Sequence, residues 1–372
     1  MAGLSGARRE PSRLRVGIAL PGGFEFGGIG RIMMYATQAW STQEDAPRWR
    51  LIDSRGAGPL SLMPLHLVKA SGQVVAGGVL RRLDLLHVNV AGRGSTLRKL
   101  VLAEAAALVG LPTIVHLHDY DYAADLAQRP PWLRSRIALM FRRARRVIAL
   151  GRRDADLIER ALDVPRERII VLHNAVPDPG PPPPRGDATP MILFLGQLSD
   201  RKGVPELLRA LASPELQRRA WRLVAAGGGP EQARFSAEAA ALGLAERVRF
   251  PGWLHQHATW ALLREAAIFA LPSHAEGQAM ALLEAMANGL AIVTTPVGAH
   301  LEAVSDGRSA LIVPPGDVAS LERAVAALLD DTERRVELGR AARRTFTERF
   351  SIDTYARQLA DIYRSALNPA GE

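Results

Sequence analysis

The sequence predicts an α/β protein of two domains, each built around a parallel β-sheet. The chain has 372 residues, which is more than one hydrophobic core usually serves. Short apolar runs alternate with helical patterns on both sides of the proline-rich segment PDPGPPPPRGD at 177–187. Four consecutive prolines fit neither a helix nor a central strand, so we expect this segment to join the domains. We predict a first domain at 1–180, a second at 186–352, and a last helix at 353–372 that packs back on the first.

The apolar runs are the expected strands. In the first domain they lie at 15–20, 83–88, 113–117, 147–150 and 169–172. In the second domain they lie at 191–195, 222–226, 248–250, 268–271, 291–294 and 311–313. Helical patterns fill most of the intervals, among them 231–242 and 318–329. Continuously apolar strands that alternate with helices are typical of buried parallel sheets, so we expect two Rossmann-like domains. Ligands should then bind at the carboxyl ends of the strands, in a cleft between the domains.

The composition excludes several classes of protein. The absence of cysteine rules out a disulfide framework, thiolate metal sites and a cysteine nucleophile, and it favours a reducing cytoplasm. We expect no signal peptide, because no long apolar segment follows the basic N-terminus. We also expect no membrane-spanning helix, because Glu104, Gly110 and Pro112 interrupt the apolar run at 100–115.

Positive charge is concentrated in the first half of the chain. Residues 1–185 hold 27 Lys and Arg against 16 Asp and Glu, whereas residues 186–372 hold 20 against 22. A basic half favours an anionic partner such as a membrane, a phosphate group or nucleic acid. The alternative is that the arginines only keep this half soluble.

Two glutamates in the segment HAEGQAMALLEAMANG, residues 274–289, indicate a binding site. Glu276 follows the expected strand 268–271, and Glu284 lies in the apolar run of a helix that ends at Asn288. Burying a carboxylate is costly without a partner. Each carboxylate can accept two hydroxyl hydrogen bonds, which suits the vicinal hydroxyls of a sugar or a ribose. Taken alone, the pair could equally be a solvated acid and a helix-start acid.

A second group of residues favours phosphate binding. Lys202 stands just ahead of a helix in LFLGQLSDRKGVPELLRAL, residues 193–211, and helix N-termini attract anions. The segment VAAGGGPE at 224–231 is another strand-to-helix turn, where glycines let the backbone approach a nucleotide. Each glycine loop alone is weak evidence, but both lie in the same half of the chain as the two glutamates.

The order of these motifs resembles the retaining GT-B glycosyltransferases of family 4, also called group 1. The shared order is GG-x-x-R, a histidine after a strand, G-x-L-x-x-x-KG, GGGP, E-x7-E with LEAMA-x-G, then PVG and PPGD, and it covers nearly the whole chain. The resemblance implies two Rossmann-like domains whose parallel sheets face each other across a cleft. It also implies transfer of a sugar from a nucleotide diphosphate to a hydroxyl acceptor, with retention of configuration. No metal and no cofactor are implied, and the nucleotide-diphosphate sugar is a co-substrate.

The resemblance implies roles for individual residues. Gly27 and Gly28 match a glycine loop near the donor diphosphate, and Lys202 matches the diphosphate-binding lysine. Glu276 would hold the donor sugar and Glu284 the ribose. The predicted donor-binding residues are Gly27, Gly28, Gln197, Arg201, Lys202, Gly228, Gly229, Glu276, Gly277, Gln278, Ala279, Met280 and Glu284.

One position departs from the family pattern. The family usually has arginine directly after the glycine of G-x-L, and here that residue is Gln197. Arg201, beside Lys202, is expected to supply the guanidinium instead. The details of phosphate binding depend on this replacement.

His118 in PTIVHLHD matches a histidine near the transferred sugar, and we expect it to be catalytic together with Glu276. It would orient the sugar or the acceptor, while the departing phosphate oxygen takes the acceptor proton. Asp119, Asp121 and His116 lie close by and could be mistaken for a metal cluster. We expect no metal there, because cationic side chains and helix N-termini can neutralise a leaving diphosphate. We interpret His116 as structural.

The acceptor is expected at AGRGSTLRK, residues 91–99. Ser95 would cap a helix that runs to about residue 109. Cations in the first turn oppose the helix dipole, so a bound anion would offset their cost. The predicted acceptor-binding residues are Arg93, Ser95, Arg98 and Lys99. The basic and apolar run RSRIALMFRRARR at 134–146 could lie on an anionic membrane surface, at the inner face of the plasma membrane.

Two other functions remain as alternatives. A basic nucleic-acid-binding protein should interleave aromatic residues with its cations, and the aromatic residues here are few and scattered. A GT-B phosphorylase or epimerase is disfavoured by the E-x7-E region. We therefore expect a nucleotide sugar and a glycan or lipid-linked acceptor as partners, and no nucleic acid. The regions 53–80 and 119–135, which should decide the substrates, follow no pattern that we can interpret.

Overall fold

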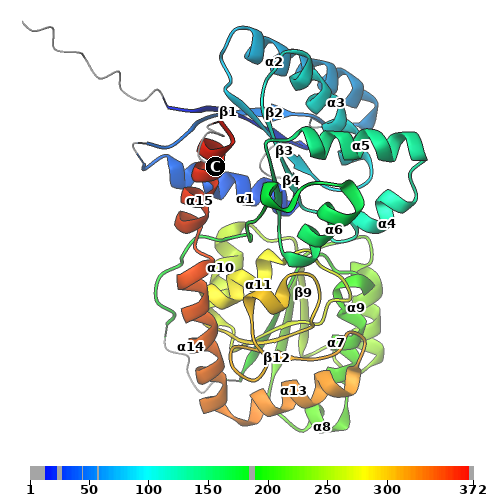
Figure 1. The fold of residues 1–372 in the computed structure, drawn as a ribbon. Helices are drawn as coiled ribbons and strands as arrows, with labels where there is room; N and C mark the ends of the chain where they lie inside the picture. Colours follow the sequence, from blue (N-terminus) through cyan, green and yellow to red (C-terminus); the bar gives the residue numbers. More distant parts are fainter. Residues whose placement is uncertain (1–12, 23–26, 44, 57, 184–188, 368–372) are drawn as a thin grey trace, which may run out of the picture. The chain divides into compact units, whose positions relative to one another are not determined.

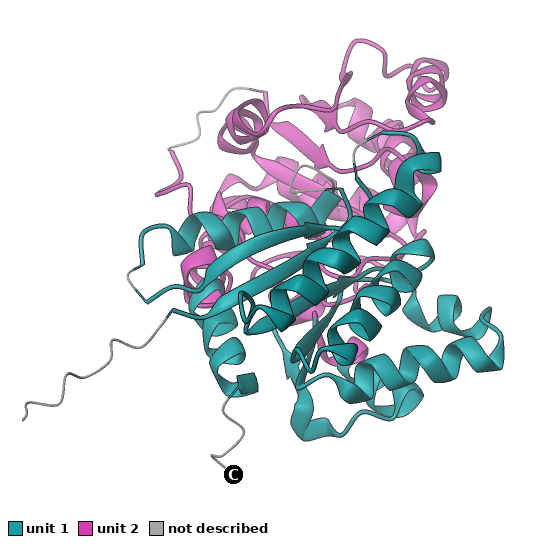
Figure 2. Cartoon of the chain, turned by 90° about the horizontal axis from the view of Figure 1, so that it is seen from above, with its two compact units in different colours: residues 1–149, 155–172, 356–372 teal, residues 150–154, 173–355 magenta. Residues whose placement is uncertain are grey.

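The structure, a computed structural model, describes residues 13–22, 27–43, 45–56, 58–183 and 189–367. The chain divides into two compact units, which Figure 2 shows in separate colours. The first unit comprises residues 1–149, 155–172 and 356–372, and the second comprises residues 150–154 and 173–355. Each unit is built on one six-stranded sheet, in which the paired strands run parallel. The predicted α/β fold class is therefore confirmed.

The sheet of the first unit has the strand order β2-β1-β3-β4-β5-β6. Its strands are β1 (Arg15–Leu20), β2 (Arg48–Asp53), β3 (Leu85–Val90), β4 (Thr113–Leu117), β5 (Arg146–Ala149) and β6 (Ile169–Val171). Strands β3 and β4 are buried along their whole length, including their polar residues His87, Asn89 and His116. Because all the strands are parallel, their carboxyl ends share one edge of the sheet.

Helices cover both faces of this sheet (Figure 1). They are α1 (Gly27–Trp40), α2 (Met63–Val79), α3 (Gly94–Leu108), α4 (Tyr122–Ala127), α5 (Pro131–Arg143), α6 (Arg152–Leu162) and α15 (Ile352–Leu367), with short 3-10 turns at Leu60–Leu62 and Arg166–Arg168. Helices α2, α3, α5 and α6 contribute to one buried apolar cluster with the strands. Helices α1 and α15 lie side by side, since the Trp40 indole donates a hydrogen bond to the Ala356 carbonyl at 3.0 Å.

The sheet of the second unit has the strand order β12-β11-β10-β7-β8-β9. Its strands are β7 (Met191–Leu195), β8 (Arg222–Ala226), β9 (Val248–Gly252), β10 (Ile268–Leu271), β11 (Ala291–Thr294) and β12 (Leu311–Ile312). Its helices are α7 (Val204–Leu211), α8 (Pro214–Gln217), α9 (Gln232–Ala241), α10 (Gln256–Glu265), α11 (Met280–Ala287), α12 (His300–Ala303), α13 (Val318–Asp330) and α14 (Thr332–Arg349), with a 3-10 turn at Asp200–Lys202. The order places the ends of β7 and β10 next to each other.

The structure corrects the sequence prediction in three places. The edge strand β2 was not predicted, because its first three residues, Arg48, Trp49 and Arg50, are exposed and two of them are charged. Helix α2 lies in the region where we could interpret no pattern. The strand expected at 83–88 is displaced to Leu85–Val90.

Candidate active site

Glu276 lies in the loop after β10, and its side chain is almost completely buried, with 8% exposed. The Lys202 ammonium nitrogen is 2.5 Å from Glu276 Oε1, and the Ser273 hydroxyl donates to the same oxygen at 2.7 Å. Arg201 Nη1 is 3.5 Å from Glu276 Oε2 and donates to the Ala275 carbonyl at 2.6 Å. Two cations that follow β7 therefore hold a carboxylate that follows β10.

A glycine makes this approach possible. Gly203 follows the turn that carries Lys202 and has a φ of +74°, which favours glycine. A Cβ at this position would lie 2.1 Å from the Pro272 carbonyl oxygen. The backbone N–H of His274 also donates to the Arg201 carbonyl at 2.8 Å. The loops after β7 and β10 are thus in direct backbone contact.

The charges around Glu276 keep it ionised. Burial by itself would raise the pKa of Glu276, but Lys202 and Arg201 together outweigh burial and hold that pKa below its usual value. An ionised carboxylate can only accept hydrogen bonds. Glu276 can therefore bind hydroxyl or N–H donors and cannot act as a general acid in this state.

The two predicted glycine loops also lie together. The Leu198 N–H donates to the Gly228 carbonyl at 3.0 Å, and a Cβ on Gly229 would contact Gln197 at 3.4 Å. A Cβ on Gly228 would lie 2.5 Å from the indole of Trp253. Trp253 directly follows β9 and is 71% exposed, which is unusual for so large a side chain. Sequence reasoning missed Trp253, although an aromatic residue at a strand's carboxyl end could have identified it.

Glu284 lies in the second turn of α11 and is 6% exposed. Gln278, Ala279 and Met280 lead into that helix and are equally buried. The amide oxygen of Gln278 accepts a hydrogen bond from the backbone N–H of Asn174 at 2.6 Å. Gln278 therefore already uses one of its polar atoms within the second unit, which the sequence could not indicate.

The PVG motif supports the loop that carries Glu276. A Cβ on Gly298 would lie 2.1 Å from the Gly277 carbonyl oxygen, and the Ala299 N–H donates to that oxygen at 2.8 Å. The next residue, His300, is fully buried, and burial lowers its pKa to about 4, although the charge of Glu276 opposes this shift. His300 is a further residue of this region that sequence reasoning missed.

In the first unit, His118 follows β4 at the carboxyl edge of the sheet. Its Nε2 is 2.9 Å from the amide oxygen of Asn89, and its ring lies 3.8 Å from the ring of His116, centroid to centroid. Burial, and then the proximity of His87, lower the pKa of His118 to about 3. His118 is therefore a neutral imidazole at physiological pH. His116 is fully buried between His87 and His118.

Gly27 and Gly28, which the resemblance assigns to a glycine loop, are the first two residues of α1. Both are exposed, and Gly27 has a φ of +68°. Since α1 follows β1, this helix N-terminus lies at the same sheet edge as His118.

The predicted acceptor residues need correction. Helix α3 begins at Gly94 with Arg93 in the N-cap position, so Ser95 is not the cap, and its hydroxyl accepts from the Ala91 N–H at 3.3 Å. Lys99 is fully buried and donates to the Ser54 hydroxyl at 2.6 Å. Burial and the neighbouring Arg98 lower the pKa of Lys99 to about 7. Lys99 therefore cannot touch a ligand at the surface.

The charge at the start of α3 is partly offset inside the protein. The carboxylate of Asp53 attracts both Arg98 and Lys99. Its Oδ1 also accepts hydrogen bonds from the backbone N–H groups of Gly22, Arg55 and Gly56 at 2.8–2.9 Å. Asp53 therefore supplies part of the negative charge that we expected a bound anion to supply.

Asp119, which could be mistaken for a metal ligand, accepts hydrogen bonds from the backbone. Asp119 Oδ2 accepts from the Gly92 N–H, and Asp119 Oδ1 accepts from the Asp121 N–H at 2.9 Å. Among the described residues, no group of three or more His, Cys, Asp or Glu side chains is arranged to hold a metal ion. Within the same residues, no helix combines the length and apolar character needed to cross a membrane.

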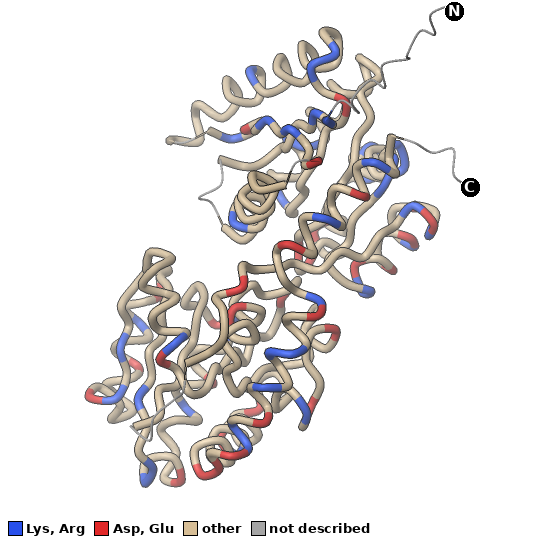
Figure 3. The backbone as a smooth tube through the Cα atoms, turned by 90° about the vertical axis from the view of Figure 1, so that its left-hand side faces the viewer, with Lys and Arg blue, Asp and Glu red and all other residues tan. Residues whose placement is uncertain are grey.

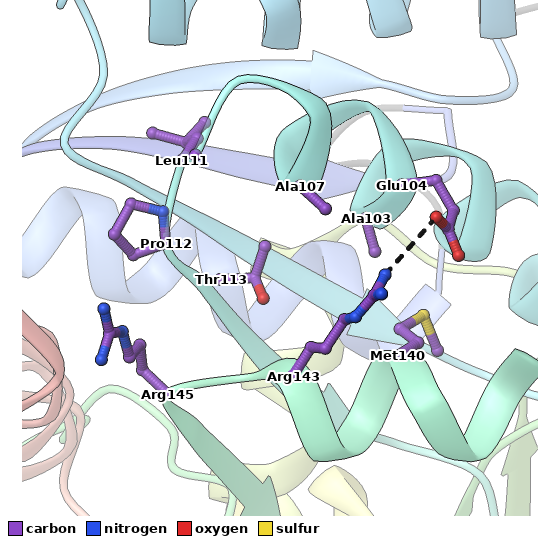
Figure 4. Close-up of a pocket in the computed structure, with 10 residues that line it drawn as sticks. Ala103, Glu104, Ala107, Leu111, Pro112, Thr113, Met140, Arg143 and Arg145 are labelled. Atoms are coloured by element: carbon purple, nitrogen blue, oxygen red, sulfur yellow. Dashed lines mark ion pairs between the residues drawn. The ribbon is translucent and has the colours of Figure 1, made fainter.

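A cavity of about 220 Å³ lies elsewhere in the first unit, between α3 and α5 (Figure 4). It opens beside Thr113, the first residue of β4, and Arg143 lies 3.8 Å from Glu104 at its wall. None of the predicted site residues lines this cavity. Because it lies at the amino end of β4, it is at the opposite edge of the sheet from His118.

Comparison with known proteins agrees with this arrangement. Residues 182–345 match the family described as glycosyl transferases group 1, and residues 31–175 match the glycosyl transferase 4-like domain. The chain is 30% identical over 310 residues to 2-deoxystreptamine N-acetyl-D-glucosaminyltransferase of Streptomyces fradiae, and the match covers 78% of this chain and 72% of that protein. It is 26% identical over 278 residues to alpha-D-kanosaminyltransferase of Streptomyces kanamyceticus, with 69% of this chain and 71% of that protein covered.

A solved structure has the same fold. HepE (Alr3699) of Anabaena in complex with UDP-glucose matches with a TM-score of 0.75 and 18% identity, covering 95% of this chain and 100% of that chain. The match at this identity concerns the fold alone. The two family matches cover the segments that carry the motifs found in the sequence, and the 30% identical relative supports the same family. The chain belongs to the group 1 glycosyl transferases, and its fold is GT-B.

Proposed function

We propose that this glycosyltransferase moves a sugar from a nucleotide-diphosphate sugar to a hydroxyl acceptor, with retention of configuration and without a metal ion. The observation that carries the proposal is the 2.5 Å contact between Lys202 and Glu276 at the ends of β7 and β10. A cation beside a hydroxyl-accepting carboxylate matches the chemistry of a sugar phosphate, which presents negative charge next to hydroxyl groups.

The leaving group would gain its stabilisation from the second unit. Lys202 and Arg201 would face the negative charge that develops on the diphosphate as the glycosidic bond breaks. Glu276 would accept hydrogen bonds from sugar hydroxyls, and Glu284 from the ribose. The departing phosphate oxygen would take the proton of the acceptor hydroxyl, so this scheme needs no carboxylic acid among the described residues. His118 would orient the sugar or the acceptor from the first unit.

The nucleotide itself would lie against the two glycine loops. Gly228 and Gly229 leave backbone within reach of a ligand, and the exposed Trp253 beside Gly228 offers a flat surface for a base. HepE was solved with UDP-glucose, so UDP-sugars are the first donors to test.

We propose a lipid-linked or polysaccharide glycan precursor as the acceptor, approached from a membrane surface. The helix that we expected to meet the membrane turns most of its apolar side chains inward. Leu133, Ile137, Met140 and Phe141 of α5 are buried, and of its large apolar side chains Trp132 is exposed. More exposed apolar side chains lie on the 3-10 turn at Leu60–Leu62 and on helices α2 and α3. They are Leu60, Leu62, Leu65, Val68, Val79, Leu97, Val101 and Leu108.

The charge around these side chains suits an anionic lipid surface. Between residues 54 and 103 the only acid in the sequence is Asp84, which pairs with Arg15, whereas six Lys or Arg residues lie outside the core and a seventh, Lys99, is buried. Figure 3 marks Lys and Arg in blue and Asp and Glu in red along the backbone. Apolar side chains next to cations bind anionic membranes by insertion and by charge attraction. We therefore propose that the protein works in the cytoplasm as a peripheral protein on the inner face of the plasma membrane.

Membrane contact is tested by pelleting with anionic and with neutral vesicles at low and high salt. We expect binding to anionic vesicles only, and weaker binding of a Leu65→Ser, Val68→Ser variant. If the protein ignores anionic vesicles at low salt, this contact does not exist.

The transfer reaction is tested in three steps. A thermal-shift panel of UDP-, GDP- and ADP-sugars should identify the donor by a raised melting temperature. Transfer to lipid-linked acceptors and to 2-deoxystreptamine, the compound named in the S. fradiae relative, should then identify the acceptor class. Activity should persist in EDTA, and NMR should show that the product keeps the donor's anomeric configuration. An inverted product, or activity lost in EDTA and restored by manganese, would refute the mechanism.

The roles of the two units can be separated by calorimetry. Lys202→Ala should weaken binding of the nucleotide diphosphate by roughly 1.5–3 kcal/mol, since it removes a charge-assisted contact. His118→Ala should keep that affinity and lose most of the turnover. Equal losses of affinity in both variants would show that the assignment of roles is wrong.

A further inference from the structure

The side chain of Asn89 forms hydrogen bonds to strand β1 and to His118. It lies on β3 and is completely buried. Its amide nitrogen donates to the Ala19 carbonyl of β1 at 3.4 Å, and its amide oxygen lies 2.9 Å from Nε2 of His118. The His118 N–H also donates to the Val90 carbonyl at 2.8 Å, which fixes the backbone of the histidine to the same strand.

These contacts have a fixed direction. A backbone carbonyl can only accept a hydrogen bond, so the NH₂ group of Asn89 must face Ala19 and its oxygen must face His118. An amide oxygen also can only accept, so Nε2 of His118 must carry the proton. In a neutral imidazole one nitrogen donates and the other accepts, so Nδ1 is then the unprotonated nitrogen.

The second nitrogen of His118 differs from the ring nitrogens of its neighbour His116. Nδ1 has no hydrogen-bond partner among the described residues, yet it is not one of their buried unpaired atoms. Both ring nitrogens of the neighbouring His116, in contrast, are buried and unpaired. Of these two rings, only that of His118 has an accessible acceptor atom.

We infer that Asn89 is a positioning residue, which holds His118 in the Nε2–H tautomer so that Nδ1 accepts a hydrogen bond from a substrate hydroxyl. The inference rests on the proposed function, in which His118 meets the sugar or the acceptor. It adds that the histidine accepts rather than donates. The substrate must therefore present an O–H or N–H group there, and a deoxy or O-methyl analogue at that position should be a poor substrate.

The tautomer can be read without any substrate. The chain has nine histidines, so ¹⁵N-histidine labelling and a His118→Ala variant for assignment make a long-range ¹H–¹⁵N spectrum practical. We expect the Nε2–H pattern for His118 in the wild type and a mixture of tautomers in Asn89→Ala. An Nδ1–H pattern in the wild type, or an unchanged tautomer in Asn89→Ala, would overturn the inference.

Kinetics of two Asn89 variants complete the test. Asn89→Ala should lower kcat about tenfold or more, because the imidazole of His118 loses its hydrogen bond to Asn89. The KM for the nucleotide sugar should change little, because Asn89 does not itself contact the nucleotide sugar. Asn89→Asp keeps an acceptor oxygen on Nε2, so it should retain the tautomer and recover part of kcat. Within the described part of the chain, the titratable groups that act on His118 are His116 and His87, both neutral, so the new carboxylate should raise the pKa of His118. The acid limb of the pH–rate profile should then move to higher pH.

The outcomes separate the two hypotheses. If Asn89→Ala releases the tautomer and kcat does not fall, the positioning inference stands and the proposed role of His118 is refuted. If kcat falls while the tautomer is unchanged, Asn89 acts only through the fold, and the inference is refuted.

Discussion

Replacing Lys202 by methionine should destabilise the second unit strongly at neutral pH. The pair is buried, with 12% of the Lys202 side chain and 8% of the Glu276 side chain exposed. Removing one partner of a buried ion pair costs about 3–5 kcal/mol, because the other charge is left uncompensated. Arg201 at 3.5 Å and the Ser273 hydroxyl at 2.7 Å would remain, so we expect a value near the lower limit, about 3 kcal/mol.

The cost should depend on pH in a definite direction. In the wild type the lowered pKa of Glu276 contributes stability above its unfolded-state value, and this contribution is lost as the pH falls through the folded-state pKa. In Lys202→Met burial would raise the pKa of Glu276. As the pH falls, Glu276 would therefore be protonated at a higher pH in the variant than in the wild type, which removes the uncompensated buried charge. The stability difference should therefore shrink between pH 7.5 and pH 5.

The assay is urea unfolding followed by circular dichroism at both pH values. The matched control is the double variant Lys202→Met, Glu276→Gln, which removes both charges and should recover most of the loss. A cost below about 1 kcal/mol at pH 7.5, or a cost that grows toward pH 5, would refute the reasoning.

Three further predictions concern single residues. Gly203→Ala should lower the melting temperature by several degrees more than Gly243→Ala, because the two glycines share a φ near +74° but only at Gly203 would the new Cβ meet a carbonyl oxygen; equal shifts would contradict the close approach. The stability of the wild type relative to Lys99→Met should rise by up to about 1.4 kcal/mol per pH unit above pH 7, since the buried amine has a pKa of about 7 and the unfolded one near 10.5. Urea melts at pH 7.5, 8.5 and 9.5 check this, and a constant difference would show that Lys99 stays charged. Trp253→Ala should weaken nucleotide diphosphate binding by about 1–2 kcal/mol in calorimetry, and UDP should quench the Trp253 fluorescence of the wild type; an unchanged affinity would exclude stacking.

The sequence predicted the second unit better than the first. Glu276 and Lys202 each follow an apolar strand, and parallel strands bring their carboxyl ends together, so both could be placed in advance. The ion pair between Glu276 and Lys202 could not be predicted, because the pattern of apolar residues does not determine which strands are neighbours in the sheet. The buried contact between Asn174 and Gln278 joins positions 104 residues apart, and no local pattern records it.

In the first unit, charge and apolar character misled the interpretation. The mixture of arginines and apolar residues at 134–146 is that of a membrane-binding helix, yet Ile137 and Phe141 are buried in the core and the exposed residues are mostly arginines. Lys99 has the positive charge expected of a phosphate-binding residue, but its side chain is buried and donates to the Ser54 hydroxyl. Side-chain direction on a helix, which decides both cases, depends on which face the sheet covers.

The first unit is discontinuous in sequence, and this limits how the chain can be divided. A fragment that stops at residue 172 would lack helix α15, so the Trp40 indole would lose the Ala356 carbonyl and His87 would lose the Tyr363 hydroxyl, which lies 2.7 Å from its Nδ1. Both contacts are buried, so the fragment would expose aromatic surface and should aggregate. A synthetic peptide with the sequence of α15, added in trans, should restore its solubility. Helix α15 therefore completes the fold of the first unit, which we expect to reach its native state only after residues 356–367 have been synthesised.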